Sequence, residues 1–171
     1  MVSVDGFMEG KDPDYNWHNW DNEMASYMMG FFKTVDTFIY GRKSYESMIA
    51  YWPSQKGEFA DVMNQTKKLI FSRTLENISW NSSLIKTNVR EQINVLKKQD
   101  GKNMVLFGGA DLAETFIANN LVDEFRLIVN PVLLGIGKPL FKNVHEIYQL
   151  KLKDTIRFAC GNIILIYEPS K

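Results

Sequence analysis

Hydrophobic residues in the first two thirds of the chain occur as short continuous runs rather than at alternating positions. Three such runs lie at Asp36–Tyr40, Lys68–Phe71 and Asn103–Phe107. Continuous hydrophobicity over this length is typical of strands that are covered on both faces, as in parallel sheets. The pattern therefore predicts three buried parallel strands.

The stretches beside these runs carry apolar residues at helical spacing. One helix is predicted over Asp21–Phe32 and a second over Ser44–Tyr51. A third begins after Asn88, where Glu91 stands in the position that a capping box requires. A fourth follows the third strand and ends at the two asparagines at 119–120.

The last third of the chain changes character. Residues Glu124–Val129 alternate in polarity, a long turn covers Pro131–Pro139, and Gln149–Lys153 with Asn162–Tyr167 predict an antiparallel hairpin. Alternating strands and helices followed by strands predict an α/β fold. We expect a mixed, mostly parallel central sheet flanked by helices, with the antiparallel hairpin at its C-terminal end.

The composition narrows the function. Lys plus Arg and Asp plus Glu number 20 each, so no overall charge favours nucleic acid or an anionic membrane. A single cysteine, Cys160, excludes an internal disulfide framework. The spacing of His18 and His145 fits no metal site. We expect a cytoplasmic protein with a small-molecule substrate and no nucleic-acid, membrane or metal partner.

Two glycines, Gly108 and Gly109, end the third predicted strand and open the fourth helix. Glycine lets a backbone approach a phosphate closely, and the free N–H groups and dipole of a helix N-terminus attract it. A tight turn with no ligand explains the pair equally well. The pair is also not the G-x-G-x-x-G dinucleotide fingerprint, which the chain lacks.

Two further strand ends carry cations and hydroxyl groups, at Gly41-Arg42-Lys43-Ser44 and at Ser72-Arg73-Thr74. In an open α/β sheet the strand ends of one edge line a single crevice where ligands bind. Three such ends together predict a site for the pyrophosphate and 2′-phosphate of a dinucleotide. Because no acidic residue stands where a free ribose hydroxyl needs one, the prediction is NADPH rather than NADH.

The order of these motifs resembles a known family. Residues 41–47 look like the Gly-Arg-x-Thr/Ser-x-Glu-Ser segment of dihydrofolate reductases, and residues 105–116 resemble their strand–Gly-Gly–helix segment. Residues 3–7, and 122–124 followed by 135–141, are closer to the RibD C-terminal-domain family and its stand-alone members. The resemblance implies a single dihydrofolate reductase-like domain over residues 1–171. It also implies hydride transfer from NADPH to a nitrogen heterocycle, as in the 5-amino-6-(5-phosphoribosylamino)uracil reductase of riboflavin biosynthesis.

The resemblance also assigns residues to the two halves of the site. The cofactor would be bound by Gly41, Arg42, Lys43, Ser44, Ser72, Arg73, Thr74, Gly108, Gly109, Ala110, Asp111, Leu112 and Ala113. Asp5 and Gly6 would lie beside the nicotinamide, and Trp17 near the substrate. Lys138, on the glycine-rich turn, is the candidate for binding a substrate phosphate.

The chain departs from the family pattern at two places. The acidic residue by which dihydrofolate reductases bind the pterin ring falls on Ala25 in an ungapped count, with Glu23 close by. The proton donor is therefore left open among Asp5, Glu23 and a bound water. The hydrophobic strand before Ser3 is reduced to two residues, so we expect a truncated N-terminal strand.

Other functions stay open beside the reductase. The chain has none of the His-x-Glu and Pro-Cys-x-x-Cys motifs of a zinc deaminase. A dihydrofolate reductase proper, a flavin-linked reductase and a non-catalytic NADPH- or nucleotide-binding module are the alternatives. Relatives with an exposed sheet edge often pair, so the resemblance also implies a homodimer.

Overall fold

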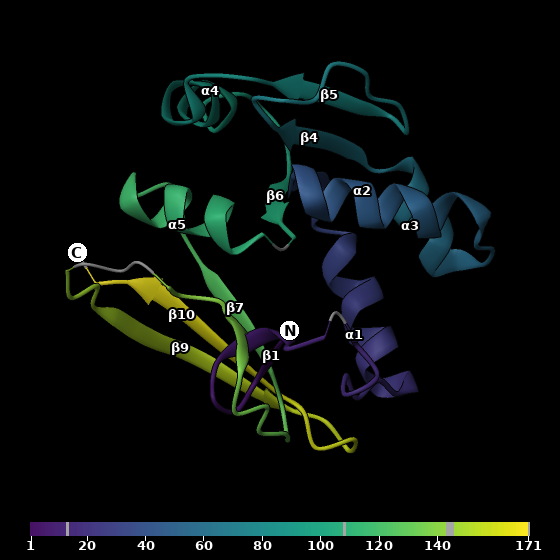
Figure 1. Cartoon of the computed structure of the whole chain (residues 1–171), viewed down its shortest axis with the longest axis vertical. Coiled ribbons are helices and arrows are strands. Elements are labelled where there is room, and N and C mark those ends of the chain that lie inside the picture. Colours follow the sequence, from purple (N-terminus) through teal and green to yellow (C-terminus); the bar gives the residue numbers. More distant parts are fainter. Residues whose placement is uncertain (13, 108, 143–145, 171) are drawn as a thin grey trace. The chain divides into compact units, whose positions relative to one another are not determined.

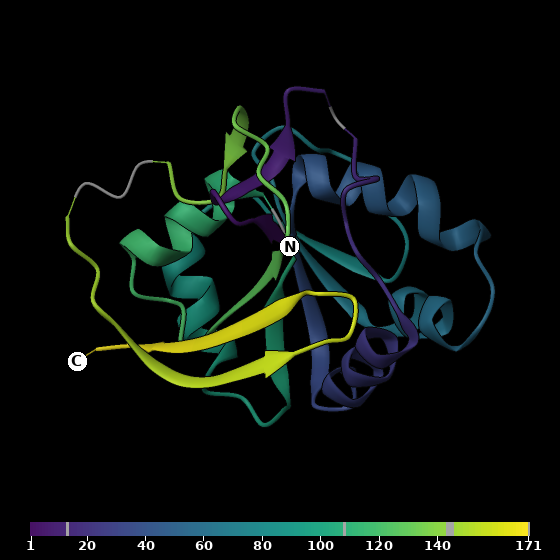
Figure 2. The ribbon, with the colours of Figure 1, turned by 90° about the horizontal axis from the view of Figure 1, so that it is seen from below.

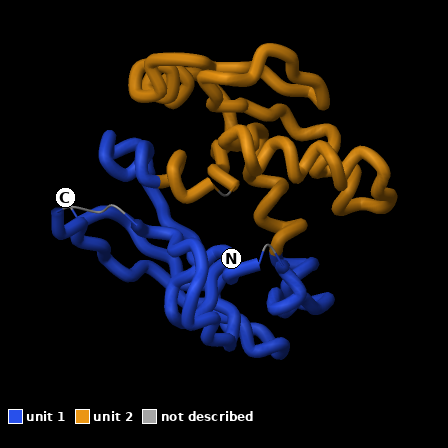
Figure 3. The backbone as a smooth tube through the Cα atoms, viewed as in Figure 1, with its two compact units in different colours: residues 1–27, 114–171 blue, residues 28–113 orange. Residues whose placement is uncertain are grey.

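The structure is a computed structural model that describes residues 1–12, 14–107, 109–142 and 146–170. The chain divides into two compact units, shown in different colours in Figure 3. Unit 1 comprises residues 1–27 and 114–171, and unit 2 comprises residues 28–113. The expectation of one domain over the whole chain stays a prediction. No helix among the described residues is long and apolar enough to cross a membrane.

Unit 2 contains a four-stranded parallel sheet of order β5-β4-β3-β6. Figure 1 labels β4, β5 and β6 of this sheet. Its strands are β3 (Val35–Gly41), β4 (Lys67–Phe71), β5 (Ser82–Ile85) and β6 (Asn103–Leu106). The three predicted strands are confirmed as β3, β4 and β6. Sequence reasoning missed β5, because its Ser-Ser-Leu-Ile segment is short and only half apolar.

The helices of unit 2 connect these strands. They are α2 (Arg42–Tyr51), a 3-10 turn at Trp52–Ser54, α3 (Glu58–Gln65) and α4 (Val89–Leu96). The expected capping box at α4 is wrong: Asn88 is the N-cap residue, but its side chain bonds no backbone N–H. Its φ of +56° is left-handed, and its Nδ2 instead donates to Glu91 Oε2 at 3.4 Å.

Aromatic side chains fill the core of unit 2 on one face of β3. The ring of Phe38 lies 5.4 Å from that of Phe32 and 4.9 Å from that of Phe107. The Phe32 ring also lies 5.4 Å from Phe59 of α3. On the opposite face, a Cβ added at Gly41 would lie 3.8 Å from Leu112 Cβ. Close packing of this kind holds the strand ends in fixed positions.

Unit 1 contains a four-stranded sheet of order β1-β7-β10-β9 and a two-stranded sheet of β2 and β8. Their bounds are β1 (Val2–Ser3), β2 (Phe7–Gly10), β7 (Phe125–Asn130), β8 (Gly137–Pro139), β9 (Leu150–Arg157) and β10 (Ile163–Pro169). The predicted antiparallel hairpin is confirmed as β9 and β10, which are seen side by side in Figure 2. The first strand is short, and it pairs in parallel with β7.

Two helices cross the boundary between the units in sequence, α1 (Asn22–Phe32) and α5 (Ala110–Ala118). In unit 1, Met24 at the start of α1 is fully buried among Phe158, Ile164 and Ile166. These three residues come from the β9–β10 hairpin and its turn. The first turns of α1 therefore pack on the hairpin through apolar side chains.

Candidate functional site

The carboxyl ends of the unit 2 strands lie along one edge of the sheet, because all four strands are parallel. Gly41, the last residue of β3, pairs with Phe71, the last residue of β4. The segments that begin at Arg42 and Ser72 therefore start from neighbouring positions. The Ser72 N–H donates to the carbonyl of Ile85, the last residue of β5, at 3.1 Å.

Gly109 lies against the first turn of α2. A Cβ added to Gly109 would stand 3.6 Å from Ser44 Oγ. The φ of Gly109 is +85°, and its carbonyl accepts hydrogen bonds from Leu112 and Ala113 at 3.0 and 2.9 Å. The structure thus brings together two of the predicted cofactor segments, with Ala110–Ala113 as the first turn of α5. Gly108 lies outside the described residues.

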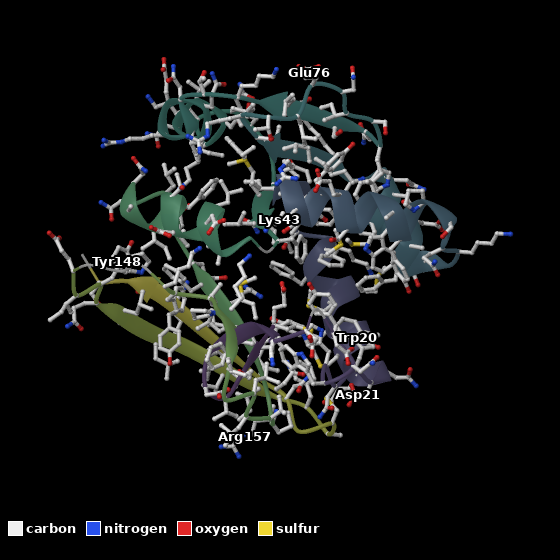
Figure 4. The ribbon with its side chains drawn as sticks, in the orientation of Figure 1. Trp20, Asp21, Lys43, Glu76, Tyr148 and Arg157 are labelled. Carbon is white, nitrogen blue, oxygen red and sulfur yellow. The ribbon has the colours of Figure 1, made fainter. Side chains whose placement is uncertain are left out.

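The first turn of α2 is suited to an anion. Its N-cap, Gly41, has no side chain to bond the free N–H groups, and the turn contains no acidic residue. Arg42 and Lys43 are exposed there, and Lys43 is labelled in Figure 4. Arg42 Nη1 lies 3.0 Å from Glu46 Oε1 in an exposed i,i+4 pair. Such pairs contribute only about 0.3–0.5 kcal/mol, so a phosphate can compete for the guanidinium.

The segment after β4 forms a turn held by its own hydroxyl. Ser72 Oγ accepts hydrogen bonds from the N–H groups of Thr74 and Leu75 at 3.2 and 3.0 Å. Arg73 and Thr74 are exposed. The hydroxyl of Ser72 therefore shapes the turn that carries Arg73.

A fourth strand end at this edge was missed by sequence reasoning. Lys86 and Thr87 directly follow β5, and both side chains are exposed. Their strand end adjoins Ser72 through its hydrogen bond to Ile85. The signal that could have found them is a cation and a hydroxyl at a strand end, as at Ser72-Arg73-Thr74. It was lost because β5 itself was not recognised.

The predicted catalytic and substrate residues belong to unit 1. Asp5 is exposed, and its carboxylate accepts three hydrogen bonds: from Ser3 Oγ at 2.6 Å, from the Leu134 N–H at 3.1 Å and from the Gly135 N–H at 2.8 Å. These bonds, that of Ser3 above all, lower the pKa of Asp5 below its ordinary value. The carboxylate is therefore charged at neutral pH and links two loops.

Gly6 and Lys138 belong to the same construction. The Leu140 N–H donates to the Gly6 carbonyl at 3.0 Å, and the φ of Gly6 is +84°. Lys138 is half-buried on β8, where it pairs with Glu9 of β2. The Asp5–Gly6 turn and the strand β8 that carries Lys138 are thus held together within unit 1.

Acidic residues at the start of α1 bind the turn of the β9–β10 hairpin. Asp21 Oδ1 accepts from the Met24 N–H at 2.8 Å and Oδ2 from the Cys160 N–H at 3.0 Å. The bond from Met24 is the main reason why the pKa of Asp21 is lowered. Glu23 Oε2 accepts from the Ala159 N–H at 3.0 Å. Trp20 and Asp21 are labelled at this helix start in Figure 4.

Trp17 and His18 form an aromatic pair before α1. Their ring centroids lie 4.1 Å apart in an edge arrangement, and Trp17 Nε1 donates to the Asp14 carbonyl at 2.9 Å. Burial lowers the pKa of His18 to about 4, so its ring is neutral at physiological pH. The pair therefore presents aromatic surface without a charge, which suits a flat heterocycle.

Asparagines fix this loop to the sheet of unit 1. The Asn19 N–H donates to Asn130 Oδ1 at 2.9 Å, and Asn19 Nδ2 donates to the Cys160 carbonyl at 2.8 Å. Asn162 Nδ2 donates to the Asn19 carbonyl at 2.7 Å. Both Asn130 and Asn162 are fully buried. Sequence reasoning missed these residues, since an isolated asparagine carries no signal of a partner far along the chain.

Comparisons with known proteins agree with this architecture. The chain is 40% identical over 171 residues to the uncharacterized protein YyaP of Bacillus subtilis (strain 168), covering 97% of this chain and 90% of that protein. A putative riboflavin biosynthesis protein from Shewanella sp. PV-4 has a similar structure, with a TM-score of 0.79 and 18% identity over 99% of this chain and 96% of that one.

A dihydrofolate reductase from Enterococcus faecalis has a TM-score of 0.68 at 13% identity, covering 99% of this chain and 93% of that one. The expected α/β, dihydrofolate reductase-like fold class is therefore confirmed. The sequence model of the RibD C-terminal domain matches residues 1–164. The chain belongs to the RibD C-terminal-domain family.

Proposed function

We propose that the protein is an NADPH-dependent reductase that transfers hydride to a nitrogen heterocycle or to a sugar carbonyl or imine attached to one. The observation that carries the proposal is the position of Gly109 against Ser44, at the edge where the parallel strands of unit 2 end. The family and fold support a reductase. The E. faecalis dihydrofolate reductase was solved in complex with NADP(H).

The residues at this edge fit the phosphates of the cofactor. A glycine with positive φ at the start of α5 leaves room for a pyrophosphate beside the free N–H groups of the helix. Arg42, Lys43 and Ser44 add charge and a hydroxyl from α2. Ser72, Arg73 and Thr74, together with Arg42, are proposed to bind the 2′-phosphate. When bound, NADPH supplies the hydride.

Residues of unit 1 are proposed to bind the substrate. The uncharged Trp17–His18 pair offers a surface on which a pyrimidine ring can stack. Lys138 supplies a cation for a substrate phosphate, as a phosphoribosylamino-pyrimidine requires. The carboxylates of Asp5 and Glu23 accept backbone hydrogen bonds. We therefore assign delivery of the proton to a water molecule. The role of Asp5 is to hold the loop at Leu134 and Gly135 in place.

Binding and turnover test the proposal separately. Titration of the protein with NADPH, followed by quenching of tryptophan fluorescence, should give saturable binding. The purified protein should then oxidise NADPH when it is given 5-amino-6-(5-phosphoribosylamino)uracil, whose ribosyl group takes up the hydride and a proton to become a ribityl group. It should do so more slowly or not at all with dihydrofolate. Oxidation with dihydrofolate as the better substrate would instead identify a dihydrofolate reductase. Binding with no oxidation by either would indicate a non-catalytic module, and no binding would refute the cofactor assignment.

A further inference from the structure

The connection between β4 and β5 has an unusual form. Parallel neighbours are normally joined by a crossover that contains a helix, yet residues 72–81 contain neither helix nor strand. This connector begins with the Ser72-Arg73-Thr74 turn and includes the exposed Glu76, labelled in Figure 4. A segment that is neither helix nor strand needs other groups to satisfy its backbone N–H and C=O groups.

Tyr45 of α2 supplies one of these groups. Its hydroxyl accepts a hydrogen bond from the Ser79 N–H at 2.9 Å and donates one to the Ser79 carbonyl at 3.2 Å. The side chain is 4% exposed. One phenol therefore bonds both backbone groups of Ser79, whose carbonyl also accepts a hydrogen bond from Ser82 Oγ. It ties the connector to the helix whose first residue is Arg42.

A second anchor holds the residue that follows. Trp80 has a φ of +67°, which is strained for a bulky side chain. Its Nε1 donates to Asn64 Oδ1 at 2.7 Å, and Lys68 Nζ lies 4.0 Å from its ring centroid. Lys68 is fully buried and also donates to the Asn64 carbonyl at 2.7 Å. Strained backbone persists where the surroundings over-determine it, as these contacts do.

The start of the connector is fixed as well, by the bonds of Ser72 to Thr74, Leu75 and Ile85. Arg73 thus lies in a segment whose two ends are pinned, one of them to α2. We propose that Tyr45 is a positioning residue for cofactor specificity, because it sets Arg73 relative to Arg42. The inference rests on the proposed function, in which these two cations bind the 2′-phosphate.

A positioning role of Tyr45 can be distinguished from a purely structural one, because NADPH and NADH differ only in the 2′-phosphate. Loss of the Tyr45 hydroxyl removes the bonds that tie Ser79 to α2 and leaves the Ser79 carbonyl bound to Ser82 Oγ. The connector is then no longer tied to α2 at this end, so we expect Arg73 to be held less firmly at the phosphate, while the pyrophosphate contacts of α2 and α5 remain. The affinity for NADPH should fall and that for NADH should stay. A tyrosine that merely stabilises unit 2 would lower the temperature of unfolding and leave the ratio of the two affinities unchanged.

The test compares Tyr45→Phe with Tyr51→Phe, a control at an exposed tyrosine on the same helix. Dissociation constants for NADPH and NADH are measured by fluorescence titration. We expect the preference for NADPH to fall about tenfold in Tyr45→Phe, which corresponds to about 1.4 kcal/mol, and to be unchanged in Tyr51→Phe. Trp80→Phe, which removes the bond to Asn64 and replaces the indole with a smaller aromatic ring, should lower the preference in the same direction.

An unchanged preference in Tyr45→Phe and Trp80→Phe would overturn the inference while leaving the proposed function standing. If Tyr45→Phe fails to fold, Trp80→Phe decides the question by the same ratio. If the wild-type protein binds neither cofactor, or binds both equally, the 2′-phosphate assignment fails, and the positioning role of Tyr45 fails with it.

Discussion

Gly109 lies beside Ser44, close to the points where α5 and α2 begin. A Cβ on Gly109 would stand 3.6 Å from Ser44 Oγ, an ordinary van der Waals distance. Sterics with Ser44 therefore do not require a glycine. The requirement comes from the φ of +85° and from the space that an approaching phosphate needs.

Substitution of Gly109 tests this account. Gly109→Ala should lower the affinity for NADPH more than tenfold, because the methyl group occupies the space of the pyrophosphate. Because alanine is strained at this positive φ, the substitution should also lower the free energy of unfolding by about 1 kcal/mol. Gly30→Ala is the control, since Gly30 lies in α1 with no atom within 4 Å of an added Cβ. Unchanged NADPH binding in Gly109→Ala would show that this turn binds no phosphate.

The cations of α2 and of the connector should discriminate between the two nicotinamide cofactors. In Arg42→Ala combined with Arg73→Ala, the affinity for NADPH should fall by about a hundredfold and that for NADH much less, since each lost charge-assisted bond to the 2′-phosphate contributes about 1.5 kcal/mol. Arg157→Ala, at an exposed position in β9 labelled in Figure 4, is the control. Equal weakening of both cofactors would remove the 2′-phosphate assignment.

Asp5 should act as a loop clamp and not as a proton donor. Its pKa is lowered in the folded protein, so its stabilising contribution is present above its unfolded pKa, about 3.9, and is lost as the pH falls through the folded value. The difference in unfolding free energy between the wild type and Asp5→Asn should therefore be largest near neutral pH and shrink in acid. If the turnover of the wild type changes with pH near neutrality and this change is lost in Asp5→Asn, Asp5 takes part in proton transfer and the role proposed here is wrong.

The sequence predicted those segments of the site whose residues are consecutive in the chain. Segments such as Gly41–Ser44 and Ser72–Thr74 combine a strand end with cations and hydroxyls, so their chemistry and their place in a parallel sheet follow from one short pattern. The bond between Tyr45 and Ser79 joins residues far apart in sequence through a single phenol. No local pattern encodes such a contact.

The strand β5 and the cap of α4, which the sequence did not predict correctly, also depend on structure that no local pattern encodes. The strand β5 was missed because only two of its four residues are apolar. Its strand conformation is stabilised by pairing with β4, which the local sequence does not show. The capping box at Asn88 has the right residues at the right spacing, but a left-handed φ turns the side chain away from the helix N–H groups. Whether a side chain caps a helix depends on the backbone conformation of that one residue, which the residue types alone do not determine.

Tyr40 should tolerate the loss of its hydroxyl. The residue is fully buried, and among the described residues its Oη has no hydrogen-bond partner, while burial raises its pKa. An unsatisfied buried hydroxyl costs about 1–3 kcal/mol. Tyr40→Phe should therefore leave the free energy of unfolding in urea unchanged or raise it. Tyr45→Phe, which loses two bonds, should lower it, and a loss in Tyr40→Phe of similar size would contradict the assignment.

Lys68 should make stability depend on pH in the alkaline range. Burial lowers its pKa from the usual 10.5 to about 8, so between these values the unfolded chain binds the proton that the folded chain has released. The free energy of unfolding therefore rises with pH across this window. Lys68→Met removes the titrating group, so the stability of the wild type relative to this variant should increase from pH 8 to pH 10.5.

Lys67→Met is the matched control, because Lys67 is exposed on the same strand. Its difference from the wild type should not change with pH over the same range, since the Lys67 side chain stays exposed to solvent in the folded protein. Urea unfolding of the three proteins across the window measures both differences. A Lys68→Met difference that stays constant with pH would mean that Lys68 keeps its ordinary pKa. In that case the cation at 4.0 Å from the Trp80 ring offsets the desolvation that burial imposes on the ammonium.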